Sequence, residues 1–522
     1  MEFLSVILLF LHLARVIDCA NILYIVPFTS TSHYIMLRPI GLELARRGHN
    51  VTVITANKET DYPPNYHQVF VEDKKKIWDV LEIKRPNVFT MVDLSAEHFH
   101  DLILWRGGVG TTEIALNSSQ VQALLKNDNK FDLILSEQFY QEAFYVLAHK
   151  YNAPLALVTT YGNCMRHNIV TRNPLQLATV ISEFLPLEDP TSFYGRLRNM
   201  YFTFYEYYWW KYWYLGKQEE LVKKYVHNLS SPVPSLYDLQ KIASLILINS
   251  HFSFDPPTAY LPNVIEIGGI HLTMSDNQLP KDFQKLLDEA KHGVIYVNFG
   301  SNVQSTELPI EKRNAFLNVF RGLKETVLWK WEDEKLDNKP DNLFVRKWMP
   351  QKEIFSHPNI KVFISHGGLI GTQEAAFHGV PIIGIPIYAD QYNNLLQAQQ
   401  IGFGKILQYH DINEENLKRE LNEMLTNKSY RIKAMEVSKR FKDRPVSALE
   451  SAMFWIEYVI RHKGSDFMKN PARNLSWIAY NMLDVYAFIF TVVAVFLCLI
   501  YGLINILFAS NKRRMTTKKK TS

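Results

Sequence analysis

The sequence predicts two α/β domains, each built on a parallel sheet with helices on both faces, followed by one membrane-spanning helix. The chain has 522 residues, which is more than one hydrophobic core usually holds. Short runs of buried-strand type alternate with segments of helical spacing in both halves, and this alternation is typical of doubly wound sheets that face each other across a cleft. Residues 485–508 are almost wholly apolar and are long enough to cross a bilayer as a helix.

The first half opens with a strand, a helix and a second strand, a βαβ unit whose strands should run parallel. Residues 36–47 show helical spacing, and Gly48 stops that helix before a β-branched run. The elements expected in this half are strands at 22–26, 51–55, 131–136 and 155–160, a loop at 27–32, and helices at 36–47 and 141–150.

The second half follows a predicted linker at Asp255-Pro256-Pro257. The same alternation of strands and helices returns there, so a second parallel sheet is expected. Its expected elements lie at residues 294–299, 310–323, 326–331, 361–365, 372–378 and 380–385. The domain ranges that we expect are 1–20, 21–248, 249–270 (the linker), 271–444, 445–483 (helices that pack back), 484–509 (the membrane span) and 510–522 (the tail).

The two ends of the chain predict a protein of the secretory pathway that is held in a membrane. Residues 3–17 are mostly apolar and small residues follow them, which is the pattern of a cleaved signal peptide, although the usual basic start is missing. Lys512, Arg513 and Arg514 follow the apolar run, so the positive-inside rule leaves them cytosolic and the body luminal. Lys519 and Lys520 resemble a dilysine retrieval signal. We expect a single-pass type I protein of the endoplasmic reticulum membrane.

Charge and cysteine content exclude two other classes of protein. Much of the formal net charge of +5 lies in the last dozen residues, so no folded basic face and no nucleic-acid partner are expected. Of the three cysteines, only Cys164 lies in the luminal body, so no internal disulfide is expected there. Sequons that permit luminal glycosylation occur at Asn117, Asn228, Asn427 and Asn474.

Glycines and polar residues gather after two predicted strands of the second half. Gly300-Ser301 follows one strand, and Ser365-His366-Gly367-Gly368 follows another and opens a helix. A glycine-rich turn at a helix N-terminus presents N–H groups and the positive end of the helix dipole, which suits a diphosphate. His366 can add a charge-assisted hydrogen bond to phosphate. Taken alone, such a turn is often only structural.

The context of this turn is more specific than the turn itself. Residues 348–391, WMPQKEIFSHPNIKVFISHGGLIGTQEAAFHGVPIIGIPIYADQ, resemble the signature of the UDP-glycosyltransferase family throughout. The resemblance extends to GLELARRGH (41–49), YLPNVIEIGG (260–269), YVNFGS (296–301) and WIEYVIRHK (455–463). It implies the GT-B arrangement of two facing Rossmann-like domains, which the strand–helix alternation predicts independently. The whole pattern of signal, luminal body, span and dilysine tail is similar to the animal detoxification branch.

The resemblance implies a role for each matching residue of the second half. Trp348 would stack on the uracil, Gln351 would bond the nucleoside, and Glu374 would accept the ribose hydroxyls. Asp390 and Gln391 would bind hydroxyls of the sugar. The diphosphate would be held by Ser301, His366 and the backbone of the turn, which includes Gly367, Gly368 and Gly371.

One departure and one absent motif qualify the diphosphate site. Plant members carry Trp, Asn and Ser after the turn, where this chain has Leu369, Ile370 and Gly371, so a side-chain phosphate contact should be lost. No Asp-x-Asp motif occurs in the sequence, so a metal-bound diphosphate is not supported. We expect no metal site and no cofactor, with the UDP-sugar as co-substrate.

The resemblance also implies a catalytic pair in the first half. His33 lies in the predicted loop after the first strand, where the family keeps its base, and an imidazole titrates near neutral pH. The family usually orients this histidine with an aspartate, but the matching stretch FDLILSE (131–137) places Glu137 there. Asp132 is the competing carboxylate, at the start of the strand, where its role looks structural. An α-linked UDP-sugar would then give a β-glycoside by inversion.

The acceptor, the donor sugar and the oligomeric state are less well defined. Residues 193–214 are crowded with aromatic side chains, which favours either a helix near the bilayer that admits lipophilic acceptors or ordinary helix packing. Three hypotheses stay open: a glycosyltransferase for small lipophilic molecules, a lipid- or sterol-dedicated one, and a catalytically silent UDP-sugar-binding protein. The segment HFSFDPP (251–257) resembles invertebrate members, which implies UDP-glucose rather than UDP-glucuronate. A homo-oligomer is not excluded.

Overall fold

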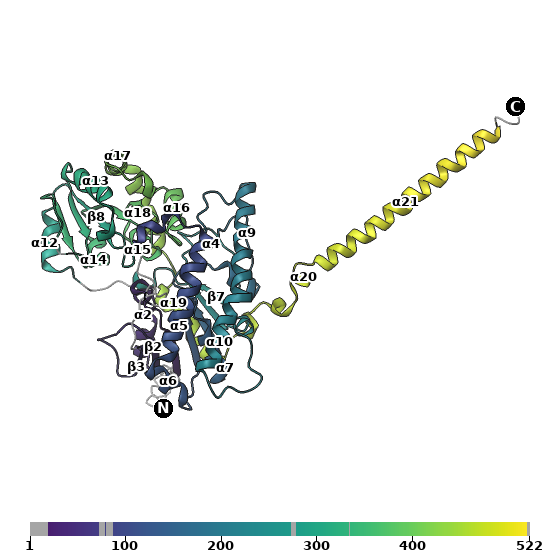
Figure 1. Ribbon diagram of the computed structural model, residues 1–522, viewed down its shortest axis with the longest axis horizontal. Coiled ribbons are helices and arrows are strands. Elements are labelled where there is room, and N and C mark those ends of the chain that lie inside the picture. The colour runs from purple at the N-terminus through teal and green to yellow at the C-terminus, as the bar shows by residue number, and fades with distance from the viewer. Residues whose placement is uncertain (1–18, 72–78, 80–86, 273–277, 334, 519–522) are drawn as a thin grey trace, which may run out of the picture. The chain divides into compact units, whose positions relative to one another are not determined.

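The computed structural model describes residues 19–71, 79, 87–272, 278–333 and 335–518. These residues form two compact units, one ending at Lys469 and one beginning at Asn470. The first unit contains two parallel sheets covered by helices (Figure 1), which confirms the predicted fold class. The apolar segment of the predicted signal peptide and the dilysine pair lie outside the described residues.

The first sheet has seven strands in the order β3-β2-β1-β4-β5-β6-β7, and every neighbouring pair runs parallel. Its strands are buried apolar runs, as expected for a sheet covered on both faces. The strand order reverses between β1 and β4, which is where such sheets bind ligands. The strands are Asn21–Val26, Asn50–Thr55, Tyr66–Phe70, Leu133–Glu137, Leu155–Val158, Leu245–Ile248 and Val264–Glu266, numbered β1 to β7.

Helices of the first half connect these strands and cover the sheet. The long helix α2 joins β1 to β2, and its buried face packs against the sheet with Met36, Leu37 and Ile40. The helices of this half are α2 (Thr31–Arg46), α4 (Ala96–Phe99), α5 (Arg106–Asn117), α6 (Ser119–Lys126), α7 (Val146–Lys150), α8 (Met165–Thr171), α9 (Phe193–Trp209), α10 (Leu215–Tyr225) and α11 (Leu236–Lys241).

The second sheet has six parallel strands in the order β10-β9-β8-β11-β12-β13, with its reversal between β8 and β11. Its strands are Val294–Asn298, Thr326–Lys330, Leu343–Arg346, Ile360–Ser365, Ile382–Gly384 and Gly404–Ile406, numbered β8 to β13. Its helices are α12 (Lys281–Glu289), α13 (Ile310–Arg321), α14 (Gln351–Ser356), α15 (Leu369–His378), α16 (Gln391–Ile401), α17 (Glu414–Thr426) and α18 (Lys428–Lys442).

The predicted linker, residues 249–270, differs from the structure at its C-terminal end. β7 lies inside that range and pairs with β6, with Val264 opposite Ile246 and Glu266 opposite Ile248. β7 has only three residues and follows a turn-rich stretch around Pro256 and Pro257, so its sequence carries little strand signal of its own. The first sheet therefore extends to Glu266, and part of the predicted linker is a strand of that sheet.

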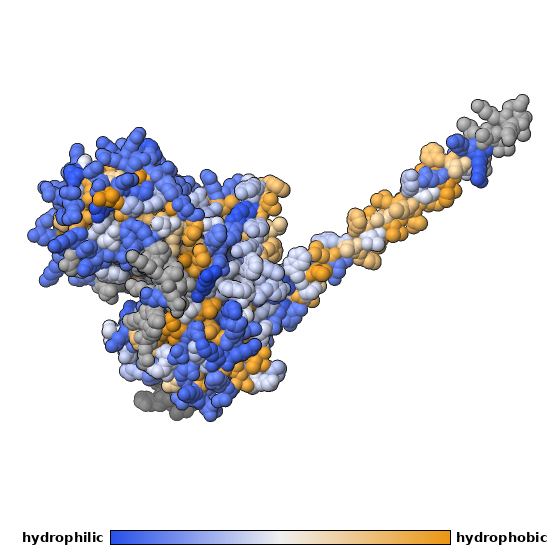
Figure 2. All heavy atoms as spheres, in the orientation of Figure 1, coloured by the Kyte–Doolittle hydropathy of each residue, from blue (hydrophilic) through white to orange (hydrophobic). Residues whose placement is uncertain are grey.

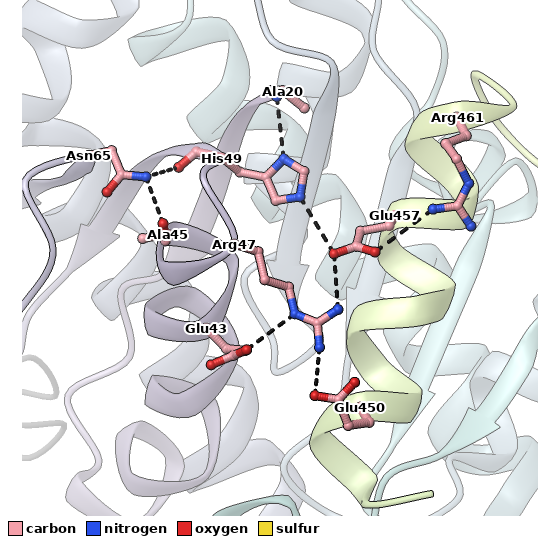
Figure 3. A network of polar contacts seen from close by, with 9 residues as sticks. All are labelled: Ala20, Glu43, Ala45, Arg47, His49, Asn65, Glu450, Glu457 and Arg461. Atoms are coloured by element: carbon pink, nitrogen blue, oxygen red, sulfur yellow. Dashed lines mark hydrogen bonds and ion pairs between the residues drawn. The ribbon is translucent and has the colours of Figure 1, made fainter. Parts of the chain in front are cut away.

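The helix α19 (Ala448–Arg461) returns from the second half and packs on the first sheet. Its apolar face, including Met453 and Ile456, is buried in the same cluster as β1 and α2. Arg47, at the end of α2, donates to Glu450 at 2.6 Å and to Glu457 at 3.2 Å (Figure 3). Apolar burial and this ion-pair network thus connect α19 to α2.

Two surfaces are rich in exposed apolar side chains. The aromatic segment is helical as predicted, since α9 begins at Phe193. Several of its aromatic residues, such as Phe193, Tyr194 and Tyr201, are exposed. Contact of this helix with a bilayer stays a prediction. In the second unit, α20 (Trp477–Tyr480) precedes α21 (Leu483–Lys518), whose apolar surface is visible in Figure 2. Among the described residues, α21 is the one helix long and apolar enough to span a membrane.

Candidate functional site

A histidine and a glutamate meet where the order of the first sheet reverses. His33 Nδ1 lies 2.5 Å from Glu137 Oε1. Glu137 is the last residue of β4, next to β1 in the sheet, and its side chain is only 1% exposed. The structure corrects one expectation here, because His33 lies in the first turn of α2 and not in a loop. The two predicted catalytic residues are therefore brought together.

Thr160 completes this group from the segment after β5. Its Oγ1 lies 3.0 Å from His33 Nδ1 and donates to Glu137 Oε1 at 3.3 Å. A hydroxyl that donates to the carboxylate has its lone pairs toward the imidazole, so Nδ1 carries the hydrogen. The tautomer that these contacts favour leaves Nε2 of His33 free to accept a proton.

The surroundings of His33 are aromatic. Phe139 packs edge-on to the imidazole with 4.5 Å between ring centroids, and Phe28 lies 5.0 Å away. The two phenyl rings also contact each other at 4.8 Å. His33 keeps a side-chain exposure of 18%, so the imidazole is accessible within an apolar wall that suits a lipophilic molecule.

Asp132 lies at the opposite end of β4 from this group. Its Oδ2 accepts a hydrogen bond from the backbone N of Asn21 at 2.8 Å. The contact joins the starts of two neighbouring strands, which run parallel. The expected structural role of Asp132 agrees with this position, and the residue cannot reach His33 at the carboxyl edge of the sheet.

The glycine-rich turn of the second half lies at the reversal between β8 and β11. The His366 ring packs between two glycines: a Cβ added at Gly300 would lie 2.7 Å from its Cε1, and one at Gly368 would lie 2.7 Å from its Nε2. Gly367 has a φ of 87°, which few other residues adopt. Glycine is therefore required on both sides of His366, and the turn leads directly into α15.

His366 itself is held neutral. Burial lowers its pKa to about 4, and the nearby Lys330 ammonium acts in the same direction. A neutral imidazole can still donate its N–H to an anionic phosphate, so the hydrogen bond expected from His366 stays a prediction. Its Nδ1 is buried with no partner among the described residues, which leaves a polar atom that a bound group can satisfy.

Lys330, which contacts this turn from β9, is a residue that sequence reasoning missed. Its Nζ donates to the backbone O of Gly300 at 2.8 Å and to Glu332 at 2.9 Å. It is the last residue of β9, so the rule that ligands bind at carboxyl strand ends could have found it. Ser301, which was predicted to bind the diphosphate, is exposed at the turn after β8.

Gln351 and Glu374 form a second polar group near this turn. Gln351 Nε2 donates to Glu374 Oε2, and Asn298 Nδ2 donates to Gln351 Oε1 at 2.6 Å. Asn298 closes β8 and also accepts from the backbone N of Gly300 at 2.8 Å. Asn298 was missed although it lies within the YVNFGS stretch. These contacts fix the amide of Gln351 with its N–H₂ toward Glu374.

Burial shifts the titration of Glu374 toward neutral pH. It raises the pKa of this carboxyl to about 7, while the hydrogen bond from Gln351 and the charge of Lys352 act in the opposite direction. Gly371 packs against Gln351, since an added Cβ would lie 3.4 Å from its Nε2.

Trp348, by contrast with the buried Glu374, is 62% exposed, so its indole face is accessible to a flat ring.

Asp390 and Gln391 lie where α16 begins. Asp390 accepts from Asn394 Nδ2 at 2.8 Å, and Gln391 Oε1 accepts from the backbone N of Ile387 at 2.8 Å. Burial raises the pKa of Asp390, while Asn394 and the His33 imidazole of the other half oppose that rise. The influence of His33 indicates that Asp390 lies close enough to the imidazole of the first half to feel its charge.

A metal-binding group is not found among the described residues, since no three His, Cys, Asp or Glu side chains gather in a way that could hold an ion. The site therefore consists of a histidine–carboxylate pair on one sheet and a glycine turn with polar and aromatic neighbours on the other. Such an arrangement can bind a nucleoside diphosphate at a helix N-terminus and place a base opposite it.

The two sheets and their facing half-sites are those of a GT-B glycosyltransferase. The structure is similar to that of a UDP-glucose:anthocyanidin 3-O-glucosyltransferase in complex with UDP, with a TM-score of 0.55 and 16% sequence identity over 84% of this chain and 99% of that one. At this identity the likeness concerns the fold.

The family follows from the sequence comparisons. The model described as UDP-glucoronosyl and UDP-glucosyl transferase matches residues 21–521, so the chain belongs to the UDP-glycosyltransferase family and is an enzyme with a UDP-sugar donor and an acceptor. It is 34% identical to the UDP-glycosyltransferase UGT5 of Dactylopius coccus, over 98% of both chains. It is also 34% identical to the UDP-glucosyltransferase 2 of Dactylopius coccus, over 94% of this chain and 93% of that relative.

Proposed function

We propose that the protein transfers glucose from UDP-glucose, with inversion, to a hydroxyl of small lipophilic acceptors, and that His33 is the general base oriented by Glu137. The observation that carries the proposal is the 2.5 Å contact between His33 Nδ1 and Glu137 Oε1. A carboxylate on Nδ1 fixes the ring and stabilises the imidazolium that forms when Nε2 takes a proton.

In the proposed reaction His33 Nε2 removes the proton of the acceptor hydroxyl as its oxygen attacks the anomeric carbon. The new C–O bond forms on the face opposite the phosphate, the bond from the anomeric carbon to the phosphate oxygen breaks, and UDP leaves with that electron pair. The backbone N–H of Gly368 and the dipole of α15 would stabilise the charge on the leaving diphosphate, whereas the Gly367 N–H already donates to Ser365 Oγ at 3.1 Å. Because attack and departure occur on opposite faces, an α-linked donor gives a β-glycoside.

The nucleotide would occupy the second half. Trp348 would stack on uracil, while Glu374, held by Gln351, would accept the ribose hydroxyls. The diphosphate would lie on the turn beside His366. Asp390 and Gln391 would bind the sugar: the Gln391 oxygen is already engaged by backbone N–H groups, so its Nε2 would act as the donor.

Two features support an active enzyme over a catalytically silent UDP-sugar-binding protein. Glu137 stands where the family usually has aspartate, yet the longer side chain reaches the imidazole at hydrogen-bonding distance. Thr160 contacts both members of the pair, which supports the same geometry. These contacts support the proposal that the glutamate orients His33 as the shorter acid does in the family.

The donor and acceptor classes rest on separate support. The name of the relative UDP-glucosyltransferase 2, together with the invertebrate resemblance, favours glucose over glucuronate. The phenyl rings of Phe28 and Phe139 beside His33 favour an apolar acceptor. A membrane-anchored, luminal enzyme of the endoplasmic reticulum agrees with the apolar helix α21 and with Lys512 and Arg513 near its C-terminal end. A lipid or sterol acceptor is the competing possibility.

The test is His33→Ala in membranes, assayed with UDP-glucose or UDP-glucuronate and a simple phenol. We expect the wild type to use UDP-glucose, and transfer by the variant to fall at least about a thousandfold while UDP binding is retained. The matched control is His67→Ala, an exposed histidine of β3 in the same half, which should leave transfer unchanged. Undiminished turnover by His33→Ala would refute the assignment of the base, and a preference for ceramide or sterol over the phenol would favour the competing acceptor class.

A further inference from the structure

Buried hydrogen bonds connect the helix that carries Glu374 to the segment that holds the histidine–glutamate pair. Gln373 lies beside Glu374 on α15, and its Nε2 donates to the backbone O of Asn249 at 3.2 Å. Its Oε1 accepts from the backbone N of Gly269 at 3.2 Å. Asn249 directly follows β6, so a helix of the second half is bonded to the carboxyl edge of the first sheet.

The connection continues from Asn249 to the pair. Asn249 Nδ2 donates to the backbone O of Thr160 at 3.0 Å, and its backbone N donates to Thr159 Oγ1 at 3.2 Å. The Thr160 hydroxyl then contacts His33 and Glu137. The connection therefore runs from Gln373 on α15 to Asn249, from Asn249 to Thr160, and from Thr160 to the imidazole, with one polar contact at each step.

All the linking residues are buried. Gln373 and Asn249 are fully shielded from solvent, and Thr160 is only 5% exposed. Hydrogen bonds away from water are stronger and more directional than exposed ones, and their loss leaves unsatisfied polar groups. The connection is therefore suited to fixing the distance between α15 and the histidine–glutamate pair. Other contacts between the halves, such as the hydrogen bond from Asn87 to Glu307 and the stacked, buried rings of Phe89 and Tyr409, do not involve Thr160, His33 or Glu137.

Sugar transfer makes that distance important. The acceptor oxygen must lie about 3–3.5 Å from the anomeric carbon, and the base must lie within hydrogen-bonding reach of the same oxygen. In the proposed function the second half holds the anomeric carbon and the first half holds the base. An error of about 1 Å in such an arrangement can cost about a hundredfold in rate.

We propose that Gln373 and Asn249, acting through Thr160, are positioning residues that hold the His33–Glu137 pair in register with the donor sugar. The proposal rests on the proposed role of His33 as the base. None of the three is assigned a contact with the nucleotide. Their contribution is to the alignment of the two halves, and it should appear in the chemical step and not in donor binding.

Gln373→Met tests this directly, because methionine has a similar length but makes neither amide hydrogen bond. We expect kcat for transfer from UDP-glucose to a phenol to fall about 10- to 100-fold, while the Kd of UDP-glucose changes by less than about twofold. Hydrolysis of UDP-glucose relative to transfer should rise, since water needs less alignment than the bound acceptor. A wild-type kcat, or a loss confined to donor affinity, would overturn the proposal.

Gln240→Met is the matched control for general destabilisation. Gln240 is also buried, donates to the backbone O of Leu236 at 3.0 Å, and its Oε1 lies 3.0 Å from His167 Nε2. It lies on α11 and makes no contact with the connection. We expect the thermal midpoint of Gln240→Met to fall as much as that of Gln373→Met, but kcat of Gln240→Met should stay unchanged. An equal loss of kcat in both variants would also reject the proposal.

Thr160→Val and Thr160→Ser keep the experiment decisive if Gln373→Met does not fold. Valine removes the hydroxyl with little change in shape, and serine restores it, so kcat should fall with valine, recover with serine, and change its pH profile only with valine. If Gln373→Met does fold, combining it with Thr160→Val should lower kcat by less than the product of the two single effects, because both act on one connection. Full activity in Thr160→Val, or a loss of kcat in the double variant equal to the product of the two single losses, would contradict the positioning role.

The two proposals can fail separately. If His33→Ala keeps its activity, the proposed base is wrong and the positioning role falls with it. If His33→Ala is inactive while Gln373→Met and Thr160→Val turn over at the wild-type rate, only the positioning role is wrong.

Discussion

The two half-sites contrast in where their polar groups find partners. In the first half, the Nδ1 of His33 is bonded to Glu137 and contacts Thr160, so the imidazole is fixed by the protein itself. In the second half, Trp348 is 62% exposed and His366 Nδ1 has no partner among the described residues. In the proposed function the first half holds the base and the second half receives the nucleotide.

This contrast follows from what each half must do. A base works best when its orientation is set in advance, because ordering it during the reaction raises the barrier. A nucleotide site needs accessible rings and donors, because stacking and hydrogen bonds to the ligand supply the binding energy. Changes at the histidine–glutamate pair should therefore act on the rate of transfer, and changes at the residues proposed to contact the nucleotide should act on donor affinity.

The largest effect is expected for Glu137→Gln. The amide can no longer carry the negative charge that stabilises the imidazolium, and its N–H₂ favours the wrong tautomer of His33. By analogy with orienting carboxylates in other triads, kcat should fall about 10³- to 10⁴-fold with the Kd of UDP-glucose unchanged. Steady-state rates together with calorimetric titration of UDP-glucose would measure both quantities.

Two further variants sharpen this result. Glu137→Asp restores the usual acid of the family but is one methylene shorter than the side chain that reaches His33 here, so we expect an intermediate loss of about tenfold. Asp132→Asn is the control, because Asp132 bonds the backbone of Asn21 at the other strand end. If Asp132→Asn lost as much activity as Glu137→Gln, the orienting carboxylate would have been misassigned.

The fold was largely predictable because buried parallel strands have a simple signature. Apolar runs between helical segments located most strands of both sheets, with errors of a few residues at their ends. The start of α2 was missed because it begins at Thr31, before the apolar spacing appears, and contains Pro39 in its interior. Proline is favoured in a first helical turn, so a start near Met36 was the better expectation from local rules.

The site was predictable only in part. The motif at residues 348–391 located His366 and Glu374. Both lie in one strand–turn–helix unit, so their spacing in the sequence already reflects their spacing in the structure. Lys330 and Thr160 come from other strands and reach the site only when the sheet is assembled. The pKa of Glu374 depends in the same way on burial that no local pattern reports. Long-range packing, and not residue type, decides these features.

Trp348→Ala should act on the other half-site. An aromatic stack on a nucleobase contributes about 1–3 kcal/mol, so the Kd of UDP-glucose should rise about 5- to 150-fold with kcat at saturation close to wild type. The indole is exposed, so its loss should leave the thermal midpoint unchanged. Trp348→Phe should recover part of the affinity.

Trp477→Ala provides the matched control for that experiment. Trp477 is 51% exposed and lies on α20, in the second unit, so its removal should not change donor affinity in detergent-solubilised protein. A fall in kcat without a change in Kd for Trp348→Ala would remove the proposed division between the two half-sites.

The smallest effect is expected in the pH dependence of donor binding. The pKa of Glu374 is raised to about 7 by burial, so the carboxyl is protonated below that pH and becomes an anion above it. An anion accepts hydroxyl hydrogen bonds more strongly, so the affinity for UDP-glucose should increase about fivefold between pH 6 and 8. Glu374→Gln should abolish this increase, whereas Glu353→Gln should keep it with a slightly lower midpoint, because the charge of Glu353 raises the pKa of Glu374. An affinity that fell with rising pH in the wild type, or the same increase in Glu374→Gln, would show that another group sets the pH response of the nucleotide half.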